Sequence, residues 1–160
     1  MLSFIKKLLG LGEQSSCCNS CCQTFDLQKD LNLNDTDLEI LQNLDDNIVI
    51  GKVEAISAHT DPEITKVKIT NTKISDTETL QILCGGTNLE EGDIVPVAKI
   101  GTKLSEDFTI GERAIRGEKS FGMICARAEL GLSPAEEEKG QIWRLPEVCE
   151  NFIGEQLKNL

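Results

Sequence analysis

The chain has 160 residues, of which 16 are Lys or Arg and 27 are Asp or Glu, so its formal net charge is −11 at pH 7. This length gives room for one ordinary domain with a modest extension, and a single core can form without help from disulfides. The acidic balance excludes indiscriminate binding to phosphate backbones, so any binding to RNA must be local and directed by shape.

Residues 1–46 are predicted to form an appendage that precedes the main domain. Apolar residues at helical spacing in 1–9 indicate a short amphipathic helix, but a bilayer-spanning helix needs about 20 apolar residues and this run is far shorter. Apolar residues between Leu31 and Leu44 predict a second helix, with Asp35 or Thr36 as its N-cap. We expect the appendage to be helical in part and otherwise poorly structured.

A cluster of cysteines stands in that appendage: Cys17, Cys18, Cys21 and Cys22. On a helix their thiolates would share one side and could bind zinc or a cluster. Zinc sites usually separate two cysteine pairs by a longer loop, however, and disulfides between chains or lipid attachment are further options. We therefore expect no cofactor and interpret the segment as an unstructured, reduced tail. The other cysteines are dispersed, which argues against a secreted disulfide framework and favours a cytoplasmic protein.

From Asn47 the sequence changes to short β-type runs separated by turn residues, the pattern of a small sandwich or barrel. Alternating apolar and polar residues predict strands at 49–55, 66–69, 80–84, 94–100 and 108–116. Pro96 lacks a backbone donor and so predicts an edge strand or a bulge. Five such strands match the strand count of an OB barrel, and we predict a mostly all-β fold with 47–157 as the domain.

Beyond the fifth strand, the sequence predicts a short extension of helix and loop. Residues 126–130 are expected to form a helical turn that ends at Gly131, and the acidic run 134–139 is expected to form a surface loop. Residues 142–145 are expected to return as a last short strand.

The stretch from Arg116 to Ala126 carries the most specific motif. It reads RGEKSFGMICA and is followed at 129–132 by ELGL. This combination resembles the tRNA-binding domain of bacterial phenylalanyl-tRNA synthetase β subunits. The stretches 47–53, 80–88, 92–97, 142–146 and 153–157 resemble parts of the same domain, so the resemblance covers roughly 47–157. It implies an OB fold that recognises tRNA as an accessory surface, with the chemistry performed elsewhere.

The candidates for contact with RNA are Lys66, Lys68, Arg113, Arg116, Ser120 and Gly122. Arg116 could offer a bidentate fork to phosphate, Ser120 could donate a hydroxyl hydrogen bond, and Gly122 lets a backbone approach closely. The lysines could follow a backbone as an OB surface does. The alternatives are a solvated lysine face and a glycine turn that serves only the core. Because aromatic residues make up only 4% of the chain, folded RNA is favoured over single strands read by stacking.

One loop departs from the resemblance, and no catalytic motif is found. At 59–64 the chain reads HTDPEI, where the family usually has histidine, proline, asparagine, alanine and aspartate, so contacts from this loop are not carried over. His59 could pair with Cys84 or Cys125 as a nucleophile, but no third orienting residue suggests itself. The sequence has no phosphate-binding glycine loop with a lysine and no histidine–carboxylate metal signature. We predict that the chain is not an enzyme.

The leading hypothesis is a cytoplasmic tRNA-binding accessory module that recognises structured RNA by shape and backbone contacts. An aminoacyl-tRNA synthetase or another translation protein is a candidate partner and a homodimer is one option, whereas DNA and membranes are not expected. One alternative is the N-terminal fragment of a phenylalanyl-tRNA synthetase β subunit that acts only in the assembled enzyme. Another is an acidic OB-fold module that binds proteins. A continuous basic stripe through the four candidate cations would favour RNA, and an uninterrupted acidic surface would favour protein partners.

Overall fold

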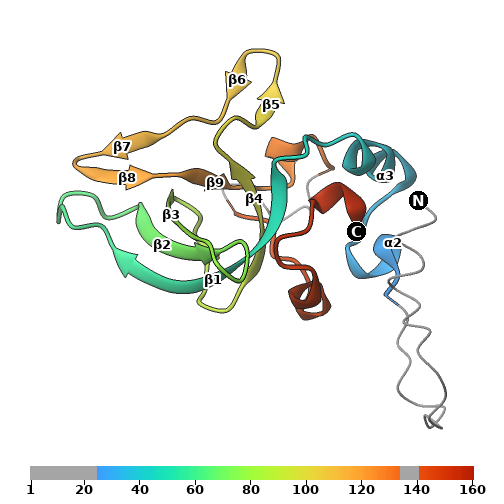
Figure 1. The fold of residues 1–160 in the computed structure, drawn as a ribbon, viewed down its shortest axis with the longest axis horizontal. Coiled ribbons are helices and arrows are strands. Elements are labelled where there is room, and N and C mark those ends of the chain that lie inside the picture. The colour runs from blue at the N-terminus through green and yellow to red at the C-terminus, as the bar shows by residue number, and fades with distance from the viewer. Residues whose placement is uncertain (1–24, 134–140) are drawn as a thin grey trace, which may run out of the picture.

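The computed structural model describes residues 25–133 and 141–160, and its main body is an antiparallel sheet coiled into a barrel with short helices at one end (Figure 1). The sheet has five strands in the order β3-β2-β1-β4-β9. Their bounds are β1 Ile48–Ala58, β2 Lys68–Lys73, β3 Thr79–Cys84, β4 Ile94–Lys99 and β9 Gly122–Ile124. The prediction of a mostly β, OB-like barrel is confirmed. The amphipathic start, the clustered cysteines and the acidic loop lie outside the described residues.

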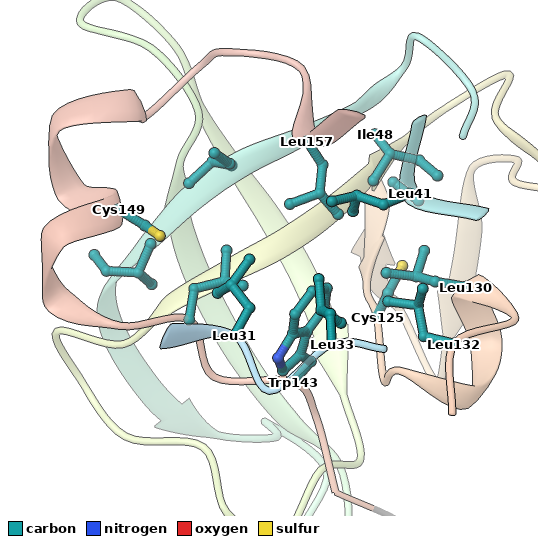
Figure 2. Packing of buried hydrophobic residues seen from close by; sticks show 14 of the residues in the cluster. Leu31, Leu33, Leu41, Ile48, Cys125, Leu130, Leu132, Trp143, Cys149 and Leu157 are labelled. Carbon is teal, nitrogen blue, oxygen red and sulfur yellow. The ribbon is translucent and has the colours of Figure 1, made fainter. Parts of the chain in front are cut away.

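The beginning of β1 and nearly all of β4 are buried on both faces because they separate two apolar clusters. Val53 and Val97 belong to the cluster inside the barrel. Ile50 and Ala98, which alternate with them along the strands, belong to a second cluster that covers one end of the barrel. Figure 2 shows this capping cluster, which includes Leu31, Leu33, Leu41, Leu130, Leu132, Trp143 and Leu157. The apolar alternation of the first predicted strand therefore describes only its barrel-facing side.

The prediction of a fifth strand at 108–116 is wrong. The chain between β4 and β9 instead forms two small hairpins, with strands β5 (Lys103–Ser105), β6 (Phe108–Thr109), β7 (Arg113–Ile115) and β8 (Glu118–Ser120). All three residues of β7 are exposed, so this stretch has no apolar face to bury in the sheet. Arg116 and Gly117, with φ of 47° and 93°, turn the chain back between β7 and β8. The fifth strand of the sheet begins only at Gly122.

The β7–β8 hairpin and β9 lie beside β3 and bring the two edges of the sheet together. The backbone N–H of Phe121 donates to the carbonyl of Gln81 over 2.9 Å. The side chain of Gln81 donates in turn to the carbonyl of Lys119 over 2.9 Å. These bonds leave the barrel nearly closed, which removes most of the open sheet edge.

Pro96 lies in an interior strand, so the expected edge strand is wrong. In the pairing of β1 with β4, Pro96 faces Ile50. The backbone of Ile50 makes its hydrogen bonds to the chain on its other side, because its N–H donates to Glu155 and its carbonyl accepts from Gly154. The missing N–H of proline therefore costs no ladder bond at this pair. The Pro96 carbonyl still accepts from Cys125 over 3.0 Å.

Two short helices precede the barrel, α2 (Leu27–Asp30) and α3 (Asp35–Gln42). The N-cap of α3 is Asn34 rather than the expected Asp35 or Thr36, and Asn34 and Asp37 form a reciprocal capping box. The leucines of this stretch belong to the capping cluster together with barrel residues. The division at residue 46 into an appendage and a domain stays a prediction.

A buried ion pair fastens α3 to the chain beyond the barrel. The side chains of Asp37 and Arg127 are 2% and 5% exposed, and their nearest charged atoms lie 3.6 Å apart. Arg127 also donates to the carbonyls of Leu31 and Asn32 over 3.1 and 3.0 Å. Burial alone would raise the pKa of Asp37, but hydrogen bonds, chiefly from the backbone of Ser133, and the charge of Arg127 outweigh it and lower that pKa.

The expected helical turn is present as the 3₁₀ turn Ala128–Leu130, and Gly131 ends it with a φ of 77°. Further 3₁₀ turns cover Glu147–Phe152 and Leu157–Asn159. The expected last strand at 142–145 is reduced to one bridge between Leu145 and Ile94. Among the helices that the structure describes, none has the length and apolar character needed to cross a membrane.

Candidate nucleic-acid interface

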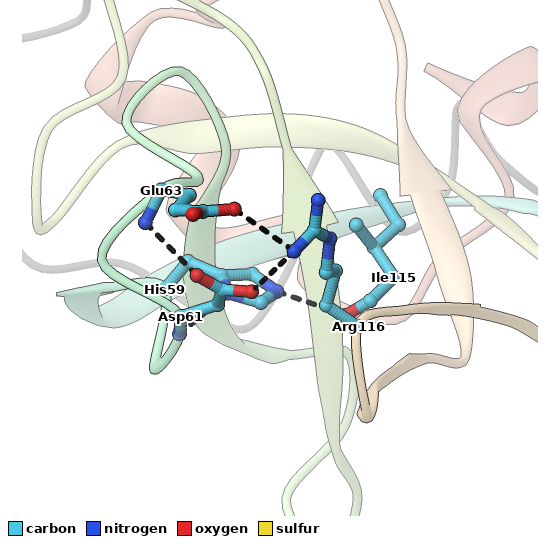
Figure 3. Close-up of polar contacts among 5 residues, drawn as sticks. All are labelled: His59, Asp61, Glu63, Ile115 and Arg116. Carbon is cyan, nitrogen blue, oxygen red and sulfur yellow. Dashed lines mark hydrogen bonds and ion pairs between the residues drawn. The ribbon is translucent and has the colours of Figure 1, made fainter.

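The β1–β2 loop, residues 59–67, and the tip of the β7–β8 hairpin meet at one end of the barrel (Figure 1). The imidazole of His59 joins them, because its Nε2 lies 2.9 Å from the carbonyl oxygen of Ile115 and its Nδ1 accepts from the backbone of Asp61 (Figure 3). Since Nδ1 accepts, Nε2 carries the proton and donates. OB folds bind oligonucleotides with the face of strands 2 and 3 and with the loops that follow strands 1 and 4. Here those two connections touch.

Arg116 stands at the tip of the hairpin and is held by two carboxylates. Its Nη1 lies 3.2 Å from Asp61 Oδ2 and 3.0 Å from Glu63 Oε2 (Figure 3). The Arg116 side chain is 57% exposed, so a phosphate group can reach the guanidinium from solvent. Such a phosphate has to compete with the carboxylates for the same donors. The sequence argument found Arg116 but not its two acidic partners.

Lys66 and Lys68 differ from Arg116 because neither has a carboxylate partner among the described residues. Lys66 is exposed in the β1–β2 loop. Lys68 begins β2 and lies in register between Ala58 and Cys84. An ammonium group without a carboxylate partner can bind phosphate without first breaking an ion pair. These two lysines can therefore bind a nucleic-acid backbone more readily than Arg116 can.

Arg113 lies at the start of β7, and its guanidinium packs over the ring of Phe108 at 5.2 Å from the centroid. Lys119, on the facing strand, pairs with Glu112 over 2.8 Å. Acidic groups at Arg116 and beside Arg113 therefore interrupt the basic stripe that would have favoured RNA. Lys66, Lys68 and Arg113 are the members of this stripe that have no ion pair among the described residues.

Ser120 and Gly122 have internal roles in this structure. The hydroxyl of Ser120 accepts from the backbone of Leu83 and donates to the carbonyl of Gly122, both over 3.0 Å, and only 7% of the residue is exposed. A Cβ atom on Gly122 would lie 2.9 Å from the carbonyl oxygen of Ala98. Both residues serve the closure of the barrel, a role that competes with the RNA contacts expected from the sequence.

A surface hollow adjoins the β1–β2 loop. It has a volume of about 390 Å³, and its lining includes Ile56, His59, Pro62, Ile64 and Lys68. Sequence reasoning missed this feature because its walls come from a strand end and an irregular loop. The departure of residues 59–64 from the family pattern was the one signal that pointed to this loop.

The cysteine thiols that the structure describes are unpaired and buried. Burial raises the pKa of Cys84, raises the pKa of Cys125 to about 12 and raises the pKa of Cys149 to about 11. Both ring nitrogens of His59 are engaged in the contacts given above, so the ring has no nitrogen left to activate a thiol. Within residues 25–133 and 141–160, no group of three or more His, Cys, Asp or Glu side chains is arranged to hold a metal ion.

Comparisons with known proteins place the chain in a family. Residues 48–151 match the family described as "Putative tRNA binding domain". The chain is 40% identical over 107 residues to a phenylalanine–tRNA ligase β subunit of Chlorobium luteolum, covering 64% of this chain and 13% of that protein. It is 36% identical over 120 residues to "Putative tRNA-binding protein YtpR" of Bacillus subtilis, covering 74% of this chain and 58% of that protein.

The chain thus spans less than two thirds of the length of either relative. A solved structure, "Crystal Structure of C-terminal Domain of Plasmodium vivax p43", covers 49% of this chain and 44% of that chain at 23% identity, with a TM-score of 0.37 that is too low to bear on the fold. The family match covers more than half of the sequence and contains all five strands of the barrel. The chain belongs to the tRNA-binding domain family.

Proposed function

We propose that this chain binds folded tRNA at the end of the barrel where the β1–β2 loop meets the β7–β8 hairpin, and that it performs no chemistry of its own. One observation carries the proposal: in a member of a tRNA-binding family, Lys66 in the β1–β2 loop and Lys68 directly after it have no carboxylate partners among the described residues, and His59 of the same loop contacts the hairpin that carries Arg116. On a chain with a net charge of −11, such local cations favour a defined contact over general attraction to RNA.

The test is a titration of the protein with folded tRNA at several salt concentrations, beside a single-stranded RNA control. We expect saturable binding of tRNA that weakens with salt, and Lys66→Ala and Lys68→Ala should each reduce the slope of log affinity against log salt by about 1. Lys29→Ala is the matched control, because Lys29 is exposed on α2 at the opposite end of the molecule (Figure 1).

Two outcomes would overturn the proposal. The first is no binding to tRNA even at low salt, which would instead favour the protein-interaction module. The second is an equal loss of affinity for the Lys29 control and the two loop lysines, which would indicate attraction without a defined site.

A synthetase is the partner that we propose for this module, since several relatives are named as β subunits of phenylalanine–tRNA ligase. The proposal extends to a cytoplasmic setting, where tRNA occurs and where the buried thiols stay reduced. A separate gel-filtration experiment with purified synthetase, with and without tRNA, tests the partner. Metal analysis of the purified protein, with the clustered cysteines replaced by serine as the control, tests our expectation that no zinc or cluster is held there.

A further inference from the structure

The hollow beside the β1–β2 loop is mostly apolar and lies on the proposed RNA surface. Its apolar walls come from Ile56 at the end of β1, from Pro62 and Ile64 in the loop, and from Val67 just before β2. The volume of about 390 Å³ lies within the range of sites that hold small ligands. A duplex cannot enter such a space, but a single flat group can.

The loop that forms the hollow is held in place by hydrogen bonds within the fold. His59 is buried and fixes the loop to Ile115 of the hairpin over 2.9 Å. The side chain of Asp61 accepts from the backbone of Glu63 over 2.9 Å, and the Asp61 carbonyl accepts from Ile64 over 3.0 Å. The hollow therefore exists before any ligand arrives, which lowers the ordering cost of binding.

Polar groups around the hollow select the chemistry of an occupant. Thr65 lines it, and the Thr65 hydroxyl has no hydrogen-bond partner within the described part of the chain. His59 and Asp61 line it too, but their polar groups are already engaged by the loop and the hairpin. Lys68 also lines it and Lys66 is its neighbour in the loop, so cations stand next to an apolar space. A nucleotide combines the matching features, because its base has apolar faces and polar edges and is joined to an anionic phosphate.

We propose that this hollow takes one unstacked nucleobase of the bound RNA, while Lys66 and Lys68 hold the phosphates next to it. The inference rests on the proposed function and adds to it the class of RNA element that is recognised. Unpaired nucleotides in loops and bulges are the parts of a folded RNA whose bases can leave the stack. Apolar side chains then replace the neighbouring bases, which suits a chain that has few aromatic residues.

The test fills the hollow without changing charge. Ala58 lines the hollow, is exposed and lies on the same face of β1 as Ile56, so Ala58→Leu places a branched apolar side chain at this wall. Asn71→Leu makes the same kind of change at an exposed position of β2 that does not line the hollow. Base-specific chemical probing of tRNA should show one unpaired nucleotide protected by the wild-type protein and by the Asn71 variant. Ala58→Leu should lose that protection and weaken tRNA binding about fivefold, the low end of what a stacked base contributes.

The outcomes separate this inference from the proposed function. If wild type and Ala58→Leu bind tRNA equally well and no unpaired base is protected, the base site is refuted while tRNA binding stands. If the wild-type protein does not bind tRNA at all, both proposals fall. Ile64→Ala, which enlarges the hollow, guards against misfolding of the filled variant, because it should also reduce the protection of that base.

Discussion

Replacing Glu63 by glutamine should strengthen tRNA binding. Glu63 is 73% exposed and lies 3.0 Å from Arg116, so the pair is a surface ion pair of the kind worth about 0.2–1 kcal/mol. If phosphate has to displace Glu63 from the guanidinium, Glu63→Gln removes this cost from binding. The affinity for tRNA should then rise between about 1.5-fold and fivefold at low salt.

Fluorescence anisotropy with labelled tRNA measures this change, and a double-mutant cycle assigns it to the ion pair. In an Arg116→Ala background the substitution of Glu63 should have little effect, because no guanidinium is left to release. An equal gain in both backgrounds would show that Glu63 acts only through general repulsion of the RNA. An unchanged or lower affinity for Glu63→Gln alone would refute the idea that its carboxylate competes with phosphate for Arg116.

Further predictions concern the core. Ser120→Ala should lower the free energy of unfolding by about 1 kcal/mol in urea without changing tRNA affinity, because the partly buried backbone N–H of Leu83 loses its acceptor. Because the pKa of Asp37 is lowered on folding, its carboxylate stabilises the protein above its ordinary value of 3.8, and this contribution is lost as the pH falls through the lower folded-state pKa. The stability difference between wild type and Asp37→Asn in urea should therefore shrink in acid. With the clustered cysteines replaced by serine, the raised pKa values of Cys84, Cys125 and Cys149 predict reaction with a thiol reagent only after unfolding.

Each of these predictions has an outcome that contradicts it. A Ser120 variant with normal stability but lost tRNA binding would return this residue to the RNA interface. A stability difference at Asp37 that grows in acid would reverse the sign of its pKa shift. Rapid labelling of thiols in the native protein would mean that the core opens locally.

The sequence predicted the fold correctly where the alternation of apolar residues and the family motif indicated the same structure. Alternation around Val53 identified the barrel-facing side of β1, and the RGEKSFGMICA motif indicated the correct fold and family. The same alternation misassigned 108–116, because an exposed hairpin and a sheet strand have the same period of two. Pro96 was misread because its tolerance depends on the hydrogen bonds of Ile50 with Gly154 and Glu155, a contact that no local pattern contains.

The site could be predicted only in part, for a similar reason. Exposure of Arg116 and of Lys66 follows from their charge. The partners of Arg116, however, lie 55 and 53 residues earlier in the chain. The internal role of Ser120 depends on Leu83, which is 37 residues away. The residue type predicted which hydrogen bonds and ion pairs these side chains can make. Which partners they actually have depends on the tertiary fold.

The hydrogen bond from Arg127 to the carbonyl of Leu31 spans 96 residues, and it bears on the order in which the protein acquires its structure. During synthesis, the leucines of residues 27–44 leave the ribosome long before Trp143 and Leu157, against which they pack. Until then part of the apolar surface against which these leucines pack is missing. Bringing the two distant segments together also costs the entropy of closing a long loop. We therefore expect the last part of the chain to set the rate of cotranslational folding, and nascent chains that stop before Trp143 to be prone to aggregation.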